Sequence, residues 1–318
     1  MIKIRNLHLN YGKSEILNIP SLDINTKKIT ALMGSNGSGK STLIRVLSRL
    51  QSPDSGEISL WGENNRPSLE MLRKICVLLP EPALLKRSVR ENFKVILKSR
   101  NLLSEFDERT SEALAFVGLD EKFLDKRHFE LSSGQTQRIA FALALSLRAP
   151  FYLLDEPTNS VDIGTSKLFS KAINLMHEKY GCGFVIASHD EKWLSMLANE
   201  CVFLHKGRVC EFEYKNIFEI EGGVLSFGGD VRLNLASNFK GKSKITINPS
   251  KIKISKTGGE GQISGILHSA SLYMGDEKLL KVKVGDFLIK IFSHDDEILK
   301  IGERVFLEFE DGSMLALE

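Results

Sequence analysis

A glycine-rich turn near the start of the chain constrains its fold more than any other feature. Residues 34–41 read GSNGSGKS and fit the pattern G-x-x-x-x-G-K-[ST]. The pattern follows ITALM, a short apolar run typical of a buried strand, and precedes KSTLIRVLSRL, whose apolar spacing predicts a helix. Glycines let backbone N–H groups converge on phosphate oxygens beside the positive end of a helix. We therefore predict a phosphate-binding loop here rather than a plain strand-to-helix turn.

Strand-like and helix-like segments alternate from the N-terminus to about residue 219. Apolar runs such as KICVLLP, FYLLDEP and GFVIASHD predict strands, and the segments between them have helical spacing. Residues 87–140 have few strand signals, which predicts a helical insertion. The alternation predicts an α/β domain over residues 1–219, with a mainly parallel sheet covered by helices on both faces.

The character of the sequence changes near residue 220. Residues 220–238 are rich in glycine, and we predict a linker there. Beyond them, short alternating segments such as KITINP, KIKISK and RVFLEFE are separated by turn signals, so residues 239–318 are predicted to form a small all-β, OB-like domain. A length of 318 residues also suits two domains, because it exceeds the usual size of one hydrophobic core.

The composition argues against several classes of protein. The net charge of +3 comes without a basic run, so nucleic acid is not an expected partner. The four cysteines form no C-x-x-C pair and have no histidines at zinc-ligand spacing, which predicts reduced thiols rather than disulfides or a zinc site. The sequence has no signal-peptide pattern and no stretch of about 18 uncharged apolar residues. We therefore expect a chain that neither enters nor spans a membrane.

Four side chains have the chemistry that hydrolysis of a nucleoside triphosphate requires. Lys40 is expected to reach the β- and γ-phosphates, and the Ser41 hydroxyl is expected to bind Mg²⁺. Asp155 ends the apolar strand FYLLD, where a carboxylate can hold the metal from the edge of the sheet. Glu156 follows directly and is a candidate to orient or deprotonate the attacking water. A solvated acidic pair at a strand end is the alternative interpretation of the two carboxylates.

The order of further motifs resembles that of the ABC ATPases. L131-S-S-G-Q135 is followed by TQRIAFALAL and then by LLDEP, which is similar to the signature and metal-binding segments of that family. The resemblance covers roughly residues 1 to 220 and implies that Tyr11 stacks on adenine, that Asp162 belongs to the D-loop and that His189 touches the γ-phosphate. A P-loop kinase or GTPase would need neither LSSGQ nor the SHD segment.

The resemblance implies ATP and Mg²⁺ as cofactors and a second copy of the chain as a partner. In this family ATP is held between the phosphate loop of one copy and the signature of the other, so ATP closes a homodimer and hydrolysis releases it. The catalytic residues implied are Glu156 and His189, and the metal ligands implied are Ser41 and Asp155. The nucleotide-binding residues implied are Tyr11, Gly34, Ser35, Asn36, Gly37, Ser38, Gly39, Lys40, Ser41, Thr42, Ser132, Ser133, Gly134, Gln135 and Asp162.

Two positions depart from the pattern of the family. The usual signature is L-S-G-G-Q, and Ser133 replaces its first glycine, a mild change if the φ angle of that residue is negative. The family also has a glutamine after the third strand, which links the metal to the membrane subunit, and Pro80 occupies that place in KICVLLPEPALL. Because proline has no side-chain oxygen, we predict that Glu81 or a water fills the metal position.

The C-terminal segments INPSKIKISK and ISGILHSASLYMGDEKLLKVKVG resemble the TOBE/MOP-like accessory domain of importer ATPases. Together with the compact N-terminal domain, they look most similar to the ATPases of tungstate or molybdate importers, with iron, sulfate and polyamine importers as alternatives. A non-transport ABC ATPase acting as a regulatory module is the alternative of a different class, but such a protein would usually carry two cassettes or a coiled-coil insertion. Ser264, Ser269 and Ser271 are candidates for an anion site, although each also suits a solvated strand face.

The resemblance also implies a setting for the chain. Its expected partners are integral-membrane permease subunits and, indirectly, an extracytoplasmic solute-binding protein. The chain would then be a peripheral protein on the cytoplasmic side of the cell membrane. We therefore expect the ATP-hydrolysing subunit of an importer that couples ATP binding and hydrolysis to the uptake of a solute.

Overall fold

The computed structural model describes residues 1–63, 67–82, 84–210, 212, 216–228, 231–259, 261–272, 277–294 and 299–317. Contacts divide the chain into two compact units, Met1–Cys210 and Glu211–Glu318. Residues 273–276, which belong to the segment that resembles the accessory domain, lie outside the described residues.

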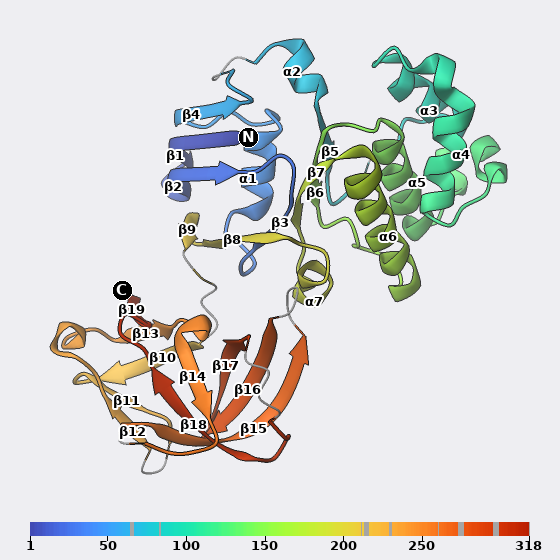
Figure 1. The fold of residues 1–318 in the computed structure, drawn as a ribbon. Coiled ribbons are helices and arrows are strands. Elements are labelled where there is room, and N and C mark those ends of the chain that lie inside the picture. The colour runs from blue at the N-terminus through green and yellow to red at the C-terminus, as the bar shows by residue number, and fades with distance from the viewer. Residues whose placement is uncertain are drawn as a thin grey trace. The chain divides into compact units, whose positions relative to one another are not determined.

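A six-stranded sheet forms the centre of the first unit (Figure 1). Its strands, in spatial order, are β5 (Ile75–Leu78), β6 (Phe151–Asp155), β7 (Gly183–Ala187), β3 (Ile29–Met33), β8 (Glu200–His205) and β9 (Arg208–Cys210). All neighbours pair in parallel except β8 and β9, so the predicted parallel sheet is confirmed. Every residue of β3, β6 and β7 is buried, which explains why these central strands are nearly continuous apolar runs.

An antiparallel sheet of three strands forms the second layer of this unit. Its spatial order is β2 (Ser14–Ile24), β1 (Ile2–Tyr11) and β4 (Ser55–Leu60). Residues Ile2 and Ile4 of β1 share one buried cluster with Leu43 and Leu47 of α1 (Lys40–Leu47). The helix that follows the glycine-rich turn is therefore anchored in the core by its apolar face.

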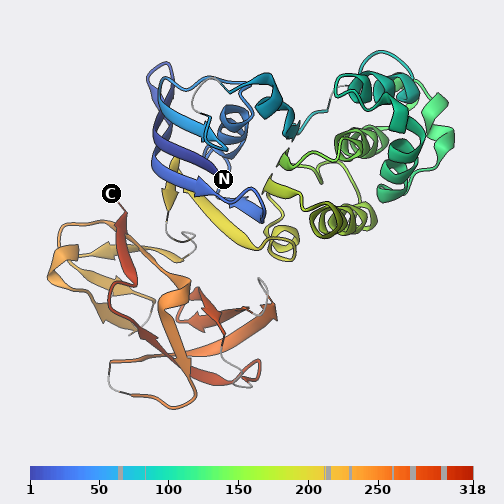
Figure 2. The same cartoon turned by 45° about the horizontal axis from the view of Figure 1, so that its top comes forward.

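Helices dominate residues 89–146, as the sequence predicts. They are α3 (Val89–Lys98), η1 (Leu103–Glu105), α4 (Phe106–Phe116), η2 (Glu121–Asp125), η3 (His128–Glu130) and α5 (Ser133–Ser146). Figures 1 and 2 show α3, α4 and α5 gathered at the end of the unit that is remote from β1, β2 and β4. A capping box between Ser88 and Glu91 begins α3, since each side chain accepts a hydrogen bond from the other residue's backbone N–H.

Three more helices lie among the described residues of the first unit. They are α2 (Leu69–Arg73), α6 (Ile163–Tyr180) and α7 (Glu191–Ser195). Phe169 of α6 stacks on Phe141 of α5 with ring centroids 4.1 Å apart, which fastens the two helices together. This contact sets the position of α5 relative to α6.

The second unit is all β, as the sequence predicts. One five-stranded sheet has the order β12 (Arg232–Asn234), β11 (Val224–Ser226), β10 (Asn216–Glu221), β13 (Lys244–Ile247) and β19 (Met314–Leu317). The other has the order β14 (Ile252–Ser255), β18 (Arg304–Phe309), β15 (Ile263–Leu272), β16 (Lys278–Val284) and β17 (Phe287–Ser293). Two short turns of 3-10 helix, η4 (Ser237–Phe239) and η5 (Pro249–Lys251), join strands, and both sheets contribute to one apolar cluster.

The glycine-rich residues 220–238 are not the linker that the sequence predicts. They contain β11 and β12, and Leu225 and Phe227 are fully buried in the core of the second unit. Gly222 and Gly223 both have positive φ angles, of 60° and 81°, and form the turn between β10 and β11. The glycines therefore mark a tight hairpin turn and not a flexible connection.

Candidate functional site

The glycines of the 34–41 loop are required by the packing around them. Gly34 has a φ angle of 146°, and a Cβ atom there would lie 2.2 Å from the carbonyl oxygen of Leu204. Gly39 has a φ angle of 103°, and its Cβ would lie 2.8 Å from Cδ2 of Leu17. Gly37 also has a positive φ angle, 77°, but its Cβ would meet no atom within 4 Å. Sterics therefore demand glycine at both ends of the loop, whereas only the backbone angle favours it in the middle.

The ammonium group of Lys40 lies against this loop. Only 8% of its surface is exposed, and Nζ donates hydrogen bonds to the carbonyl oxygens of Gly34, at 2.8 Å, and Ser35, at 3.1 Å. Burial lowers the pKa of Lys40, while the nearby carboxylates of Glu156 and Asp155 oppose that shift. The ammonium group thus lies near both the loop that precedes its helix and the carboxylates of Asp155, which ends β6, and Glu156, which directly follows it.

Ser41 and Asp155 lie in direct contact, although 114 residues separate them in the chain. The Ser41 hydroxyl donates to Oδ1 of Asp155 at 3.1 Å, and Asp155 has 1% of its surface exposed. Burial raises the pKa of Asp155, and the hydrogen bond from Ser41 opposes that shift. A cation beside this carboxylate would remove the penalty of burying its charge.

Two buried polar atoms at the loop have no hydrogen-bond partner among the described residues. They are Oγ of Ser38 and Oδ2 of Asp155. Such atoms are rare in native structures and call for a ligand, an ion or water. A hydroxyl can donate to a phosphate oxygen, and a carboxylate beside a hydroxyl is a donor set that suits Mg²⁺. The residues present therefore fit a phosphate group and a magnesium ion.

Glu156 and His189 form a pair beside Asp155. Oε2 of Glu156 accepts a hydrogen bond from the His189 backbone N–H at 3.2 Å and lies 2.8 Å from Nδ1 of the ring. The Glu156 side chain is mostly buried, whereas that of His189 is 67% exposed. The backbone N–H of Glu156 donates to Ala187 at the end of β7, at 2.8 Å. The ends of β6 and β7 therefore bring the two predicted catalytic residues together.

The signature residues cap helix α5. Ser132 accepts from the backbone N–H of Gln135 at 3.3 Å, and the Gln135 side chain accepts from the Ser132 N–H at 3.1 Å. Ser133 lies in the first turn of the helix and is not among the described residues with positive φ, so a glycine is not needed there. A Cβ atom on Gly134 would lie 3.1 Å from the carbonyl oxygen of Ser160. Within the described residues, no hydrogen bond joins this signature to the 34–41 loop.

Asp162 and Tyr11 lie on the surface of the first unit. Asp162 caps α6, since its carboxylate accepts from the backbone N–H of Thr165 at 2.7 Å, and this bond lowers the pKa of Asp162. Tyr11 is 49% exposed, and its hydroxyl donates to Oε1 of Gln51 at 2.9 Å. Each residue thus bonds to a neighbour in the same unit, while the Asp162 carboxylate and the Tyr11 ring remain exposed to solvent.

An apolar groove lies beside Pro80, the residue that stands where the family pattern has a glutamine. Its volume is about 400 Å³, and Val77, Leu79, Leu84 and Leu143 line it together with Glu81. It lies between the end of β5 and helix α5, and Glu81 is exposed. The residues after β5 thus border an apolar groove.

One polar contact at this site was not predicted from the sequence. Gln137 in helix α5 is buried, and its Nε2 donates to the carbonyl oxygen of Pro157 at 2.9 Å. The sequence does contain a signal for this contact. Gln137 comes just before the apolar run IAFALAL, and an amide that is buried with such a run needs a hydrogen-bond partner. The identity of that partner depends on how α5 packs against the loop after β6.

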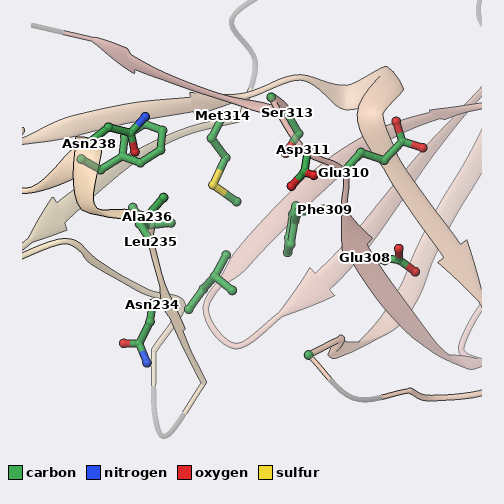
Figure 3. A pocket seen from close by; sticks show the side chains of 14 residues that line it. Asn234, Leu235, Ala236, Asn238, Glu308, Phe309, Glu310, Asp311, Ser313 and Met314 are labelled. Atoms are coloured by element: carbon green, nitrogen blue, oxygen red, sulfur yellow. The ribbon is translucent and has the colours of Figure 1, made fainter.

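The second unit has a cavity of about 440 Å³ between β12, η4 and the turn after β18 (Figure 3). Leu235, Phe309 and Met314 give it an apolar lining, and Asp311 supplies a carboxylate. Figure 3 shows Glu308 and Glu310 pointing away from Met314. Ser264, Ser269 and Ser271 do not line this cavity; on β15, Ser264 and Ser271 are exposed and Ser269 is half-buried. A carboxylate and apolar groups suit an oxyanion poorly.

Comparisons with known proteins agree with this arrangement. A family model described as ABC transporter matches residues 17–159. The tungstate uptake system ATP-binding protein TupC of Campylobacter jejuni is 42% identical over 98% of this chain and 94% of that protein. The sulfate/thiosulfate import ATP-binding protein CysA of Mesostigma viride is 30% identical over 92% of this chain and 90% of that protein.

A solved structure shares the fold of the first unit. It is a dimeric ATP-binding cassette in a post-hydrolysis state with ADP and Pi, and it is 27% identical with a TM-score of 0.59. The match covers 66% of this chain and 96% of that cassette.

Proposed function

The chain belongs to the ATP-binding proteins of ABC transporters, and from this premise we propose that it powers the uptake of tungstate. The observation that carries the proposal is the 42% identity to a tungstate uptake ATP-binding protein, which extends over 98% of the chain and therefore over both units. Family members that import sulfate or thiosulfate are more distant, at 30% identity. Molybdate is the second candidate solute, because it is a tetrahedral oxyanion of nearly the same size as tungstate.

ATP binding rests on the 34–41 loop. The backbone N–H groups of the loop and the N-terminus of α1 surround the phosphates, and Ser38 donates its unpartnered hydroxyl to a phosphate oxygen. Lys40 exchanges its contacts with the carbonyls of Gly34 and Ser35 for the β- and γ-phosphates. The exposed ring of Tyr11 offers a face on which adenine stacks.

Hydrolysis rests on the carboxylates after β6. Ser41 and Asp155 would hold Mg²⁺, which neutralises the negative charge that develops on the phosphates. Glu156 orients the attacking water and accepts its proton, and the contacts from His189 fix the position of the carboxylate. Positioning and electrostatic stabilisation supply most of the rate enhancement in phosphoryl transfer.

A second copy of the chain completes each ATP site in this proposal. Ser132 and Gly134 begin helix α5 and would meet the γ-phosphate of ATP bound to the partner copy. The exposed carboxylate of Asp162 would lie at the same interface. ATP then joins the two copies, and loss of the γ-phosphate lets them separate.

Membrane permease subunits are the partners that receive this motion. Among the described residues, no helix is long and apolar enough to cross a membrane. The apolar groove beside Pro80, lined by Val77, Leu79, Leu84 and Leu143, suits an amphipathic segment of a permease. The chain would then lie at the cytoplasmic face of the membrane, with an extracytoplasmic protein delivering the solute to the permease.

Uptake by a strain that lacks this chain tests the proposed solute. We expect tungstate accumulation to fall and to recover with the parent chain but not with a Lys40→Ala variant, which separates loss of ATP binding from loss of the protein. Tungstate, molybdate, sulfate, iron and polyamines are quantified in parallel. Unchanged tungstate with a loss of sulfate, iron or polyamine uptake would overturn the solute and leave the ATPase assignment intact.

A further inference from the structure

The buried side-chain amide of Gln137 lies outside the groups that bind ATP or act in hydrolysis in the proposed function. Only 3% of its surface is exposed, and the helix residues that follow it, such as Ile139 and Phe141, are fully buried and apolar. Nε2 donates to the carbonyl oxygen of Pro157 at 2.9 Å. A buried amide without a partner is strongly unfavourable, so this hydrogen bond restricts where α5 and the loop after β6 can lie relative to each other.

The accepting carbonyl belongs to the residue that directly follows Glu156. Glu156 has a φ angle of 51°, a left-handed conformation that residues other than glycine seldom adopt without support from their surroundings. Its own N–H donates to Ala187 of β7, and its carbonyl accepts from Asn159 at 3.0 Å. Pro157 has no N–H, so its carbonyl is the one backbone hydrogen-bonding group that this residue offers.

Helix α5 touches this loop at a second point. Gly134 approaches the carbonyl oxygen of Ser160 so closely that a Cβ atom would lie 3.1 Å from it. Ser160 also has a positive φ angle, of 63°. The first turns of α5 therefore lie against the 156–162 loop beside Glu156 and at Ser160, which are the two described residues of this loop with left-handed backbone angles.

We propose that Gln137 is a positioning residue for Glu156, and that the position of helix α5 thereby controls the catalytic carboxylate of the same chain. The proposal rests on the role of Glu156 in the proposed function. A displacement of α5 pulls on the Pro157 peptide through the Gln137 amide and turns the Glu156 side chain relative to the water it orients. The helix that carries the signature is thus linked to the catalytic residue by one buried hydrogen bond.

The proposal predicts that Gln137 acts on turnover and not on ATP binding. Replacing Gln137 by Met keeps an unbranched side chain of similar size but removes the donor. We expect kcat for ATP hydrolysis by the full chain to fall ten- to a hundredfold, in line with the effect of a misplaced catalytic group, and KM for ATP to change less than twofold. Ser146→Ala is the matched control, because Ser146 is buried in the same helix and, within the described part of the chain, its hydroxyl bonds only to the Leu143 carbonyl.

A Gln137→Glu variant adds a pH readout that a structural role would not give. An ionised glutamate cannot donate to the Pro157 carbonyl, whereas a protonated one can. Burial raises the pKa of a carboxyl in this position, so the activity deficit of the Glu variant should shrink as the pH falls from 8 to 6. The deficit of the Met variant should stay constant over the same range.

A double-mutant cycle with Glu156→Gln decides whether Gln137 acts through Glu156. If it does, Gln137→Met should change the residual turnover of the Glu156→Gln background less than twofold. Equal fold-losses in both backgrounds, or a Met variant with the kcat of the parent, would overturn the proposal. Failure of the parent chain to hydrolyse ATP would instead count against the proposed function.

Discussion

The loop at 34–41 and the loop at 156–162 both contain residues in left-handed backbone conformations, but they hold these residues in different ways. The first uses glycine at each of its three positions of positive φ, Gly34, Gly37 and Gly39. The second has Glu156 and Ser160 in such conformations and relies on contacts from β7 and α5 to hold them. The shape of the first loop is therefore encoded locally, whereas the shape of the second depends on tertiary contacts.

The largest expected effect separates the chemical roles of the two loops. Glu156→Gln should lower the rate of ATP hydrolysis by a factor of about 100 or more while ATP still binds, because the proposed general base is lost. Lys40→Ala should instead weaken nucleotide binding itself, since the buried ammonium group of the first loop is removed. Nucleotide titration and steady-state turnover of both variants separate these roles. A Glu156→Gln variant with nearly normal turnover would show that another group activates the water.

The next largest effect tests whether its own glycines set the shape of the 34–41 loop. Gly34→Ala places a Cβ atom 2.2 Å from the Leu204 carbonyl, so the loop must shift, and we expect nucleotide affinity to fall more than tenfold. Gly37→Ala is the matched control, because its Cβ meets no atom within 4 Å and only the left-handed angle opposes it, at about 1 kcal/mol. Equal affinities for the two variants would mean that packing against Leu204 does not shape the loop.

A smaller effect concerns the stability of the fold without metal. Burial raises the pKa of Asp155, so its ionised form destabilises the folded chain at neutral pH. The favourable contribution of Asp155 to the free energy of unfolding is present below the pKa that its carboxyl has in the unfolded chain. This contribution is lost as the pH rises through the higher pKa that the carboxyl has in the folded chain. Metal-free Asp155→Asn should therefore unfold at a higher temperature than the parent at pH 7, with a difference that shrinks on acidification. Thermal unfolding measured from pH 7 down to pH 5 checks this.

The stability experiment has a built-in control. Addition of Mg²⁺ and ATP should raise the unfolding temperature of the parent more than that of Asp155→Asn, because the variant lacks the carboxylate that holds the cation. A variant that is less stable than the parent without metal at pH 7 would contradict the assigned cost of burying the Asp155 charge.

The smallest effect is expected at Pro80, which belongs to neither loop. Pro80→Gln restores the amide that related ATPases are expected to carry at this position, so the variant should fold and its Mg²⁺-dependent ATPase activity should be equal to or higher than that of the parent. Activity at several Mg²⁺ concentrations provides the measurement. A collapse of folding or activity would mean that proline is needed for the shape of the segment after β5.

Much of the fold was predictable because the signals are local. Continuous apolar runs predicted β3, β6 and β7, and the alternating segments predicted the all-β second unit. The linker predicted over 220–238 was wrong, because glycine serves both flexible connections and tight hairpins. Only the burial of Leu225 and Phe227 in the second core distinguishes these uses.

The sequence by itself determined that this chain has a glycine-rich loop of the phosphate-binding pattern followed by an acidic strand end. That inference is possible because the chemistry of Lys40, Ser41 and Asp155 lies in residue types at set places along the chain. Only the tertiary structure decided that Ser41 meets Asp155, that His189 meets Glu156 and that Gln137 meets Pro157. The partners in each of these contacts lie 20 or more residues apart in the chain, and such contacts form only when separate strands and helices pack into one core.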